Sequence, residues 1–176
     1  RMATQLTIGL LGAGKMATAL ARGFVRAALV SPKDIIASDP HEIARKSFAD
    51  EVGAKTFKAG ADIVQAAGIL ILAVKPDQIA PLLAEQHENF TADKVLISIA
   101  AGVTLAKLEA ALPSGARVVR VMPNTPALVG ESASAFALGK SATAADGELA
   151  KKLLSAVGIA FQVKESLLDA VTGLSG

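Results

Sequence analysis

Short runs of apolar, mostly branched residues recur along this chain and alternate with segments of helical character. They predict strands at Leu6–Leu11, Ile35–Ser38, Ile69–Val74, Val95–Ile99 and Val118–Met122. Two of them, "ILILAV" and "VLISI", lack any polar alternation, which is typical of central strands covered on both faces. Strands that alternate with helices predict an α/β fold with a doubly wound, mainly parallel sheet and helices on both faces.

Helical patterns fill the segments between these strands. An apolar stripe through Met16, Leu20 and Phe24 predicts an amphipathic helix that packs inward along one face. Gly53 and Pro113 stand where helices would end. The segment "KPDQIAPLL" contains two prolines, which leaves the start of its helix open. Further helices are expected at Pro40–Val52, Thr104–Leu112 and Ala144–Val157.

Composition excludes several classes of function. The 18 basic and 16 acidic residues leave a net charge of +2 and are scattered, and only 3% of residues are aromatic, so we expect no nucleic-acid partner. The absence of cysteine excludes disulfides and thiol chemistry, and no histidine or carboxylate cluster predicts a metal site. The longest apolar run is far below the roughly 20 residues that span a bilayer, so we expect no membrane partner and a cytoplasmic location.

The stretch "GAGKMA" lies directly after the first predicted strand and directly before a helix, in a G-x-G-x-x-A pattern. Gly12 would permit a tight turn, Gly14 would let the backbone approach a pyrophosphate, and Ala17 would let helix and strand pack closely. The pattern therefore predicts a dinucleotide site on a Rossmann-type fold. A glycine turn that merely joins strand to helix is the structural alternative.

The second predicted strand ends in "IIASDP". Asp39 stands where a carboxylate would accept hydrogen bonds from the adenosine ribose and favour NADH. Because proline follows it, Asp39 could equally be a helix N-cap, and both roles could hold. A 2′-phosphate would be repelled by Asp39, but Ser38, Arg45 and Lys46 are near enough in sequence to offset that charge. The cofactor is therefore NADPH or NADH, with the choice open.

Two further strand ends are candidate ligand contacts. The stretch "AVKP" closes a central strand at its carboxyl end, where Lys75 would face a cofactor or lie solvated in a loop. The stretch "RVMPNTP" leads from a strand into a loop stiffened by Pro123 and Pro126, which would carry ligand contacts or form a plain structural turn. No residue set supplies a catalytic acid and base, so the catalytic residues stay unassigned. Hydride transfer is compatible with this, since the nicotinamide carries the chemistry.

Taken in order, "IGLLGAGKMA", "AVKP", "SIAAGV" and "RVMPNTPALVG" resemble the N-terminal domain of the pyrroline-5-carboxylate reductase family, over essentially the whole chain. The resemblance implies reduction of 1-pyrroline-5-carboxylate to L-proline with NADPH or NADH. It also implies three groups of cofactor contacts, at the pyrophosphate, at the ribose, and along the path to the nicotinamide. These are Gly12, Ala13, Gly14, Lys15, Met16 and Ala17; Ser38 and Asp39; and Ala73, Val74, Lys75, Pro76, Met122, Pro123 and Asn124.

The resemblance also implies a division of the chain. Residues 1–164 would form the dinucleotide-binding domain, and residues 165–176 would start a linker helix towards a C-terminal helical domain. In the family that domain supplies most of the substrate pocket, a threonine for proton delivery and the homo-oligomer interface. We therefore expect a fragment that binds cofactor but is not active alone. A related NAD(P)-dependent imine or carbonyl oxidoreductase and a non-catalytic nucleotide-sensing module are the alternatives.

Overall fold

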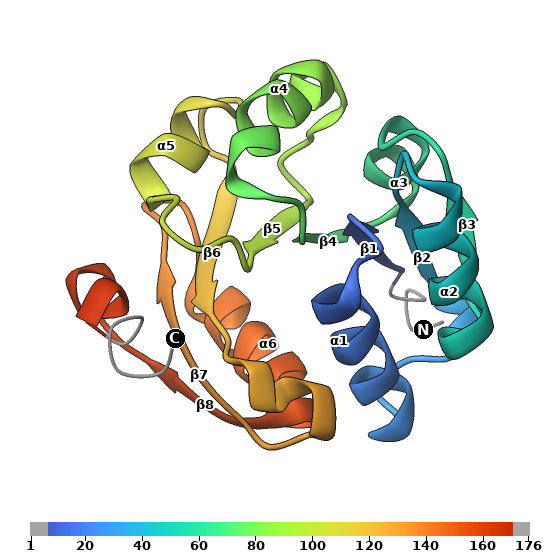
Figure 1. The fold of residues 1–176 in the computed structure, drawn as a ribbon. Coiled ribbons are helices and arrows are strands. Elements are labelled where there is room, and N and C mark those ends of the chain that lie inside the picture. The colour runs from blue at the N-terminus through green and yellow to red at the C-terminus, as the bar shows by residue number, and fades with distance from the viewer. Residues whose placement is uncertain (1–6, 171–176) are drawn as a thin grey trace, which may run out of the picture.

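The computed structural model describes residues 7–170, and in this part of the chain eight strands form one sheet (Figure 1). The strands are β1 (Ile8–Leu11), β2 (Ile35–Ser38), β3 (Lys55–Phe57), β4 (Ile69–Leu72), β5 (Val95–Ser98), β6 (Arg117–Met122), β7 (Ser132–Leu138) and β8 (Gly158–Gln162). The helices are α1 (Lys15–Arg26), α2 (Glu42–Val52), α3 (Ala61–Ala66), α4 (Pro76–Gln86), α5 (Leu105–Ala110) and α6 (Ala144–Leu154). Short 3-10 helices include η3 (Thr125–Val129), η4 (Ser155–Val157) and η5 (Glu165–Leu167).

The strand order is β3-β2-β1-β4-β5-β6-β7-β8. All neighbouring strands run parallel except β6 and β7. The chain steps outward from β1 through β2 to β3 and then returns to β4, on the other side of β1. In open α/β sheets, ligands bind at the carboxyl ends of the strands where the order reverses in this way. The predicted doubly wound, mainly parallel fold is confirmed, and its reversal point lies between β1 and β4.

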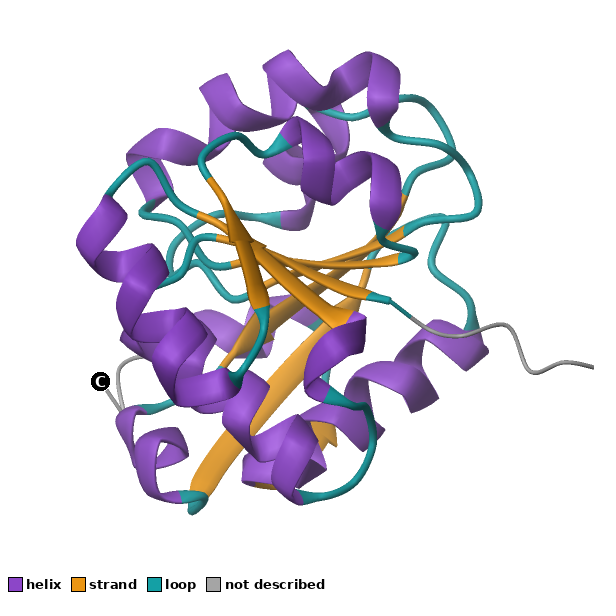
Figure 2. Cartoon of the chain, turned by 90° about the vertical axis from the view of Figure 1, so that its right-hand side faces the viewer, coloured by secondary structure: helices purple, strands orange, loops and turns teal. Residues whose placement is uncertain are grey.

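Helices cover both faces of the sheet (Figure 2). One core lies against α1, α2 and α6, and the other against α3, α4 and α5. Successive side chains of a central strand point to opposite faces, so in β4 Ile69 and Ile71 enter the first core while Leu70 and Leu72 enter the second. Because both faces are buried, the strand has no polar position, as the run "ILILAV" indicated.

Several boundaries differ from the prediction, and four elements were missed. The strand expected at Ile69–Val74 ends at Leu72, and the helix expected from Pro40 begins at Glu42. The missed elements carry weak signals: β3 has three residues and begins with an exposed lysine, and α3 has six. Strand β7 reads "SASAFAL", whose small residues favour no particular element, and β8 is mostly exposed.

A buried arginine fastens the end of the described chain to the sheet. Arg120 on β6 is 1% exposed, and its guanidinium donates to Glu165 at 3.0 Å and to Asp169 at 2.8 Å. Glu165 also accepts the backbone N–H of Leu105 at 2.7 Å, which links the same carboxylate to the start of α5. Residues 165–170 of the expected linker thus contact β6 and α5. The rest of that segment, 171–176, lies outside the described residues.

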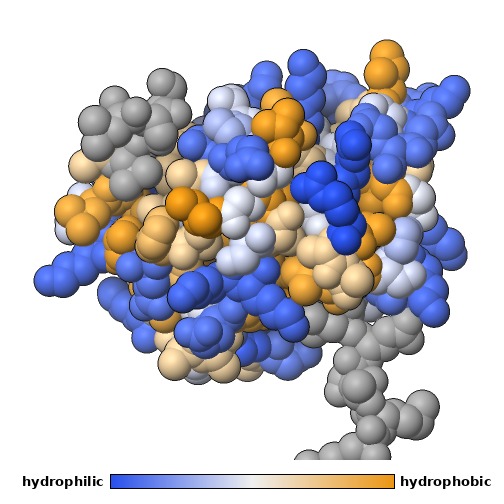
Figure 3. Space-filling view, turned by 90° about the horizontal axis from the view of Figure 1, so that it is seen from below, coloured by the Kyte–Doolittle hydropathy of each residue, from blue (hydrophilic) through white to orange (hydrophobic). Residues whose placement is uncertain are grey.

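On the face of the molecule seen in Figure 3, hydrophobic side chains lie in small groups between hydrophilic ones. Exposed large hydrophobic side chains in residues 7–170 include Ile43, Leu128 and Val129. Within residues 7–170, the structure has no helix with both the length and the apolar character needed to span a bilayer.

Candidate cofactor-binding site

The turn after β1 is built around Gly12. Its backbone N–H donates to the carbonyl of Ser38 at the end of β2, at 2.8 Å, and its φ of +104° suits glycine. A Cβ at this position would lie 2.6 Å from the carbonyl oxygen of Ala73, just beyond β4. Gly12 is therefore required by the packing of the protein itself, between the ends of β1 and β4.

Gly14 is different, because nothing in the protein requires a glycine there. It is the N-cap of α1, with φ −77° and ψ −174°, a conformation that other residues adopt readily. A Cβ added to Gly14 would meet no atom within 4 Å. The bare backbone is thus open to the outside, and a phosphate could approach it closely, as the G-x-G-x-x-A pattern predicts.

The first turn of α1 offers donors for an anion. The N–H groups of Lys15 and Met16 belong to the first turn of the helix, where N–H groups have no acceptor within the helix. The N–H of Ala13 is already used, since it donates to Asp39 Oδ2 at 3.1 Å. Ala17 is 1% exposed and packs in the core below the turn. The first turn thus fits a pyrophosphate, with donors at Lys15 and Met16.

Asp39 holds the turn after β2 together. Its Oδ1 accepts the N–H of His41 at 2.9 Å, an Asx-type turn that delays the helix start to Glu42. The predicted role of Asp39 as the helix N-cap is therefore wrong, because α2 begins at Glu42 and His41 occupies the N-cap position. The same carboxylate joins this turn to the glycine turn through Ala13, so Asp39 is structural on both of its oxygens. A carboxylate has further lone pairs, and the ribose contact stays a prediction.

A crevice of 360 Å³ joins the ends of β1, β2 and β4. Predicted site residues Gly12, Ser38, Asp39 and Val74 all line it. The rest of its wall was not predicted from the sequence and consists of Pro40, Lys58, Ala59, Gly60, Leu82 and Glu85. Lys58 to Gly60 follow the short strand β3, whose three residues gave no recognisable strand signal. The crevice lies at the reversal point of the sheet, where the adenosine half of a dinucleotide is expected.

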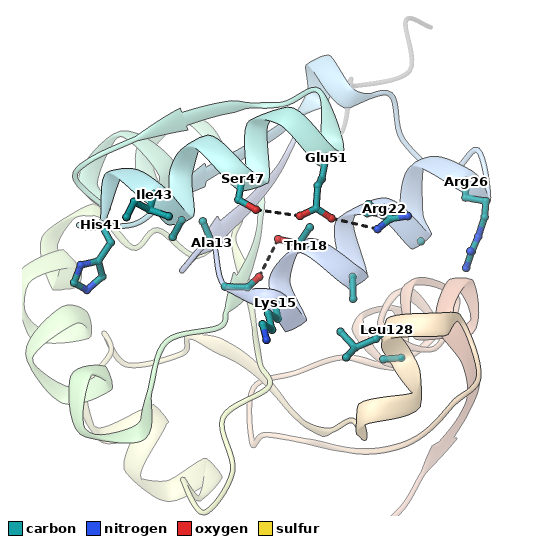
Figure 4. A pocket seen from close by; sticks show the side chains of 15 residues that line it. Ala13, Lys15, Thr18, Arg22, Arg26, His41, Ile43, Ser47, Glu51 and Leu128 are labelled. Carbon is teal, nitrogen blue, oxygen red and sulfur yellow. Dashed lines mark hydrogen bonds and ion pairs between the residues drawn. The ribbon is translucent and has the colours of Figure 1, made fainter.

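A larger cavity of 660 Å³ starts at the same turn and runs along α1 (Figure 4). Ala13, Gly14 and Lys15 line one end, and Leu128 of η3 lies across from α1. Its far side is crossed by an ion pair between Arg22 of α1 and Glu51 of α2, at 3.2 Å. The glycine turn thus borders both the larger cavity and the crevice, and the crevice is the one at the ends of β1, β2 and β4.

The remaining predicted contacts are not among the residues that line the crevice. Lys75 is the exposed N-cap of α4 and lines neither cavity. Asn124, after β6, accepts hydrogen bonds from Ser132 Oγ and from the Ala133 N–H, each at 3.0 Å. Its side-chain oxygen therefore closes the loop onto β7. Nicotinamide contacts at Met122 to Asn124, and cofactor contacts at Ala73, Lys75 and Pro76, stay predictions.

Within residues 7–170, no group of three or more histidine, aspartate or glutamate side chains could hold a metal ion. Elsewhere, the hydrogen bond from Thr91 lowers the pKa of the exposed Asp93. Asp93 lines neither cavity. The crevice, with Lys58 and the carboxylates Asp39 and Glu85 in its wall, can bind and orient a ligand.

Comparison with known proteins agrees with this geometry. Residues 7–102 match a family described as "NADP oxidoreductase coenzyme F420-dependent". This span contains the glycine turn, the whole crevice and strands β1 to β5. The chain belongs to this family, which defines it as an NADP(H)-binding domain of an oxidoreductase.

More particularly, the chain is similar throughout to pyrroline-5-carboxylate reductases. It is 50% identical over 169 residues to the enzyme of Methanosarcina acetivorans, covering 96% of this chain and 63% of the relative. The structure superposes on the reductase of Coxiella burnetii with a TM-score of 0.91 at 28% identity, covering 98% and 64% of the two chains. For the Plasmodium falciparum reductase with NADP bound, the TM-score is 0.87 at 28% identity, covering 97% and 62%. The chain thus spans somewhat less than two thirds of these relatives.

Proposed function

We propose that this chain is the cofactor-binding part of a pyrroline-5-carboxylate reductase, which reduces 1-pyrroline-5-carboxylate to L-proline with NADPH or NADH. The observation that carries the proposal is Gly14, whose bare backbone serves no packing need and lines the 660 Å³ cavity that starts at the glycine turn. The relatives named as reductases match nearly all of the chain. The proposal includes the cytoplasmic location expected from the sequence.

The residues present fit a dinucleotide. The first turn of α1 offers donors to the pyrophosphate, and Ser38, Asp39 and Val74 form the wall of an adenosine crevice. When bound, the nicotinamide would supply a hydride to the carbon of the C=N bond. The chain's own contribution is to fix the orientation of the two phosphates and the adenosine, which places the nicotinamide over the strand ends.

The proposal also assigns cofactor binding and substrate turnover to different regions of the relatives' chains. The relatives extend well beyond the region that they share with this chain. We therefore assign the substrate pocket, the proton donor and the homo-oligomer contacts to that further region of the relatives. The 176 residues on their own would bind cofactor and turn over little substrate.

Two measurements test this. Calorimetric titration with NADPH and with NADH avoids intrinsic fluorescence, which the absence of tryptophan makes impractical. Binding of either cofactor supports the proposal, and no heat from either at millimolar cofactor contradicts it. Loss of nicotinamide absorbance with 1-pyrroline-5-carboxylate should then be far slower than about 1 per second per chain, a rate ordinary for enzymes. A rate of that order would contradict the proposal that these 176 residues on their own turn over little substrate.

A further inference from the structure

The crevice has one cation among the residues that line it, Lys58. This residue follows β3 directly, and β3 pairs in parallel with β2 so that Phe57 stands opposite Ser38. The ladder extends one step further, since the Asp39 N–H donates to the Phe57 carbonyl at 3.1 Å. Lys58 is therefore brought beside Asp39, at the place where the ribose of a dinucleotide would lie.

A second cation, Arg45, is bonded to the backbone of the same turn but does not line the crevice. Arg45, on the first turns of α2, donates through Nη1 to the carbonyl of Asp39 at 2.8 Å and to that of Pro40 at 3.0 Å. These two bonds fix the guanidinium against the loop that ends β2. Lys46, the other cation that sequence proximity suggested, is exposed and, like Arg45, lines neither cavity.

The charges in the crevice oppose one another. Asp39 and Glu85 are the carboxylates in its wall, and Lys58 is the cation that faces them. With the carboxylates alone, the crevice would repel a phosphate and favour the plain 2′-hydroxyl of NADH. Asp39, moreover, uses each oxygen to accept a backbone N–H, which leaves it less free to receive the ribose hydroxyls. Lys58 is thus the lining residue whose charge could offset those carboxylates.

We propose that Lys58 is the specificity-determining residue of this site, holding the 2′-phosphate of NADP(H). The inference rests on the proposed function and adds to it the preference for NADPH over NADH. A phosphomonoester dianion beside a lysine ammonium gains a charge-assisted hydrogen bond that a hydroxyl cannot match. Ser38, in the same wall, is in position to add a neutral hydrogen-bonding group.

The test compares Lys58→Gln with Lys55→Gln. Lys55 is the exposed first residue of β3, so its variant makes the same change of charge three residues away and outside the crevice. Each variant is titrated calorimetrically with NADPH and NADH, and with the fragments 2′,5′-ADP and 5′-AMP, which report the adenosine end alone. Unfolding in urea establishes that both variants remain folded.

For Lys58→Gln we expect NADPH and 2′,5′-ADP to bind at least tenfold more weakly, with NADH and 5′-AMP changed less than threefold. Lys55→Gln should resemble the parent chain. The parent's preference for NADPH should also shrink as salt rises from 50 to 500 mM. Equal losses for both cofactors would make Lys58 a structural residue and overturn the inference, as would an unchanged preference. Failure of the parent to bind either cofactor would instead contradict the proposed function.

Discussion

Two turns at the carboxyl edge of the sheet, the glycine turn after β1 and the loop after β6, were both predicted as cofactor contacts, yet they are built in different ways. The glycine turn leaves Gly14 open and the first N–H groups of α1 without helical acceptors. The loop after β6 uses Asn124 to bind its own continuation at Ser132 and Ala133. A polar residue at a strand end thus indicates a ligand only when the protein has not already used it.

The same contrast holds for the strands behind these turns. Beneath the glycine turn, Ile8 and Leu10 of β1 are buried and apolar. Strand β6 instead carries the buried Arg120, whose charge is neutralised by Glu165 and Asp169. We therefore expect substitutions in the β6 region to lower the free energy of unfolding. In the glycine turn, we expect one substitution to change stability and another to change the affinity for the cofactor.

The largest effect is expected on removing the acidic partners of Arg120. The double variant Glu165→Gln, Asp169→Asn leaves a guanidinium with 2% exposure uncompensated, and should lower the free energy of unfolding by about 3 kcal/mol. Arg120→Met should cost less, because the two carboxylates are 32% and 69% exposed and water can solvate them. Urea denaturation measures both. An equal or larger loss in Arg120→Met would contradict this account of the ion pairs.

The second-largest loss of stability is expected for Gly12→Ala. The φ of +104° and the approach of a Cβ to within 2.6 Å of the Ala73 carbonyl oxygen together should cost about 2 kcal/mol of unfolding free energy. Thermal unfolding compares this variant with the parent chain. Gly14→Ala is the matched control, since its Cβ would meet no atom of the protein within 4 Å. Similar losses in the two variants would remove the distinction between a packing glycine and a ligand glycine.

The substitution Asn124→Ala tests whether the loop after β6 stabilises the protein or contacts the cofactor. Loss of the acceptor for Ser132 and Ala133 should lower stability by about 1 kcal/mol, while the affinity for NADPH changes less than threefold. Asn124→Asp, which keeps the accepting oxygens, should recover much of the stability. If the alanine variant instead stays stable and loses NADPH affinity, Asn124 is a cofactor contact, as the resemblance implied.

The smallest effect lies outside both turns, at Thr91. Its hydroxyl is the main cause of the lowered pKa of Asp93, from a reference value of 3.8. A carboxyl whose pKa is depressed by folding adds stability above its unfolded pKa and loses it as the pH falls through the folded pKa. Thr91→Val should therefore be slightly less stable than the parent at pH 7, with a difference that narrows towards pH 3. If the difference in stability between the variant and the parent instead grew on acidification, the hydrogen bond from Thr91 would not be the cause of the lowered pKa of Asp93.

The sequence predicted the central sheet well because its strands are buried on both faces and consist of continuous apolar runs. It missed β3, β7 and β8, where strands are short, rich in alanine and serine, or largely exposed. Such strands form because a neighbouring strand offers a ladder of hydrogen bonds, and their own residues carry little of that information.

In the candidate site, too, the residues of a local sequence pattern were predicted, and a residue whose position depends on strand pairing was not. Gly12, Gly14 and Ala17 form a local pattern whose spacing itself encodes the turn. Lys58 could not be found in this way, because its place beside Asp39 depends on the pairing of β2 with β3. The residues after β4 and β6 were predicted from their position at strand ends and from the resemblance to a family, and neither could show that Asn124 is engaged by its own loop.

The central claim is that Gly14 is kept open for a dinucleotide, and calorimetric titration of NADPH into the parent chain and into Gly14→Ser tests it most directly. Serine is a preferred N-cap, so the free energy of unfolding should be unchanged or slightly higher. We predict that NADPH binds the parent chain and binds the variant at least tenfold more weakly, because the new side chain occupies the approach to the phosphates. Equal NADPH affinity in the two chains would contradict the claim.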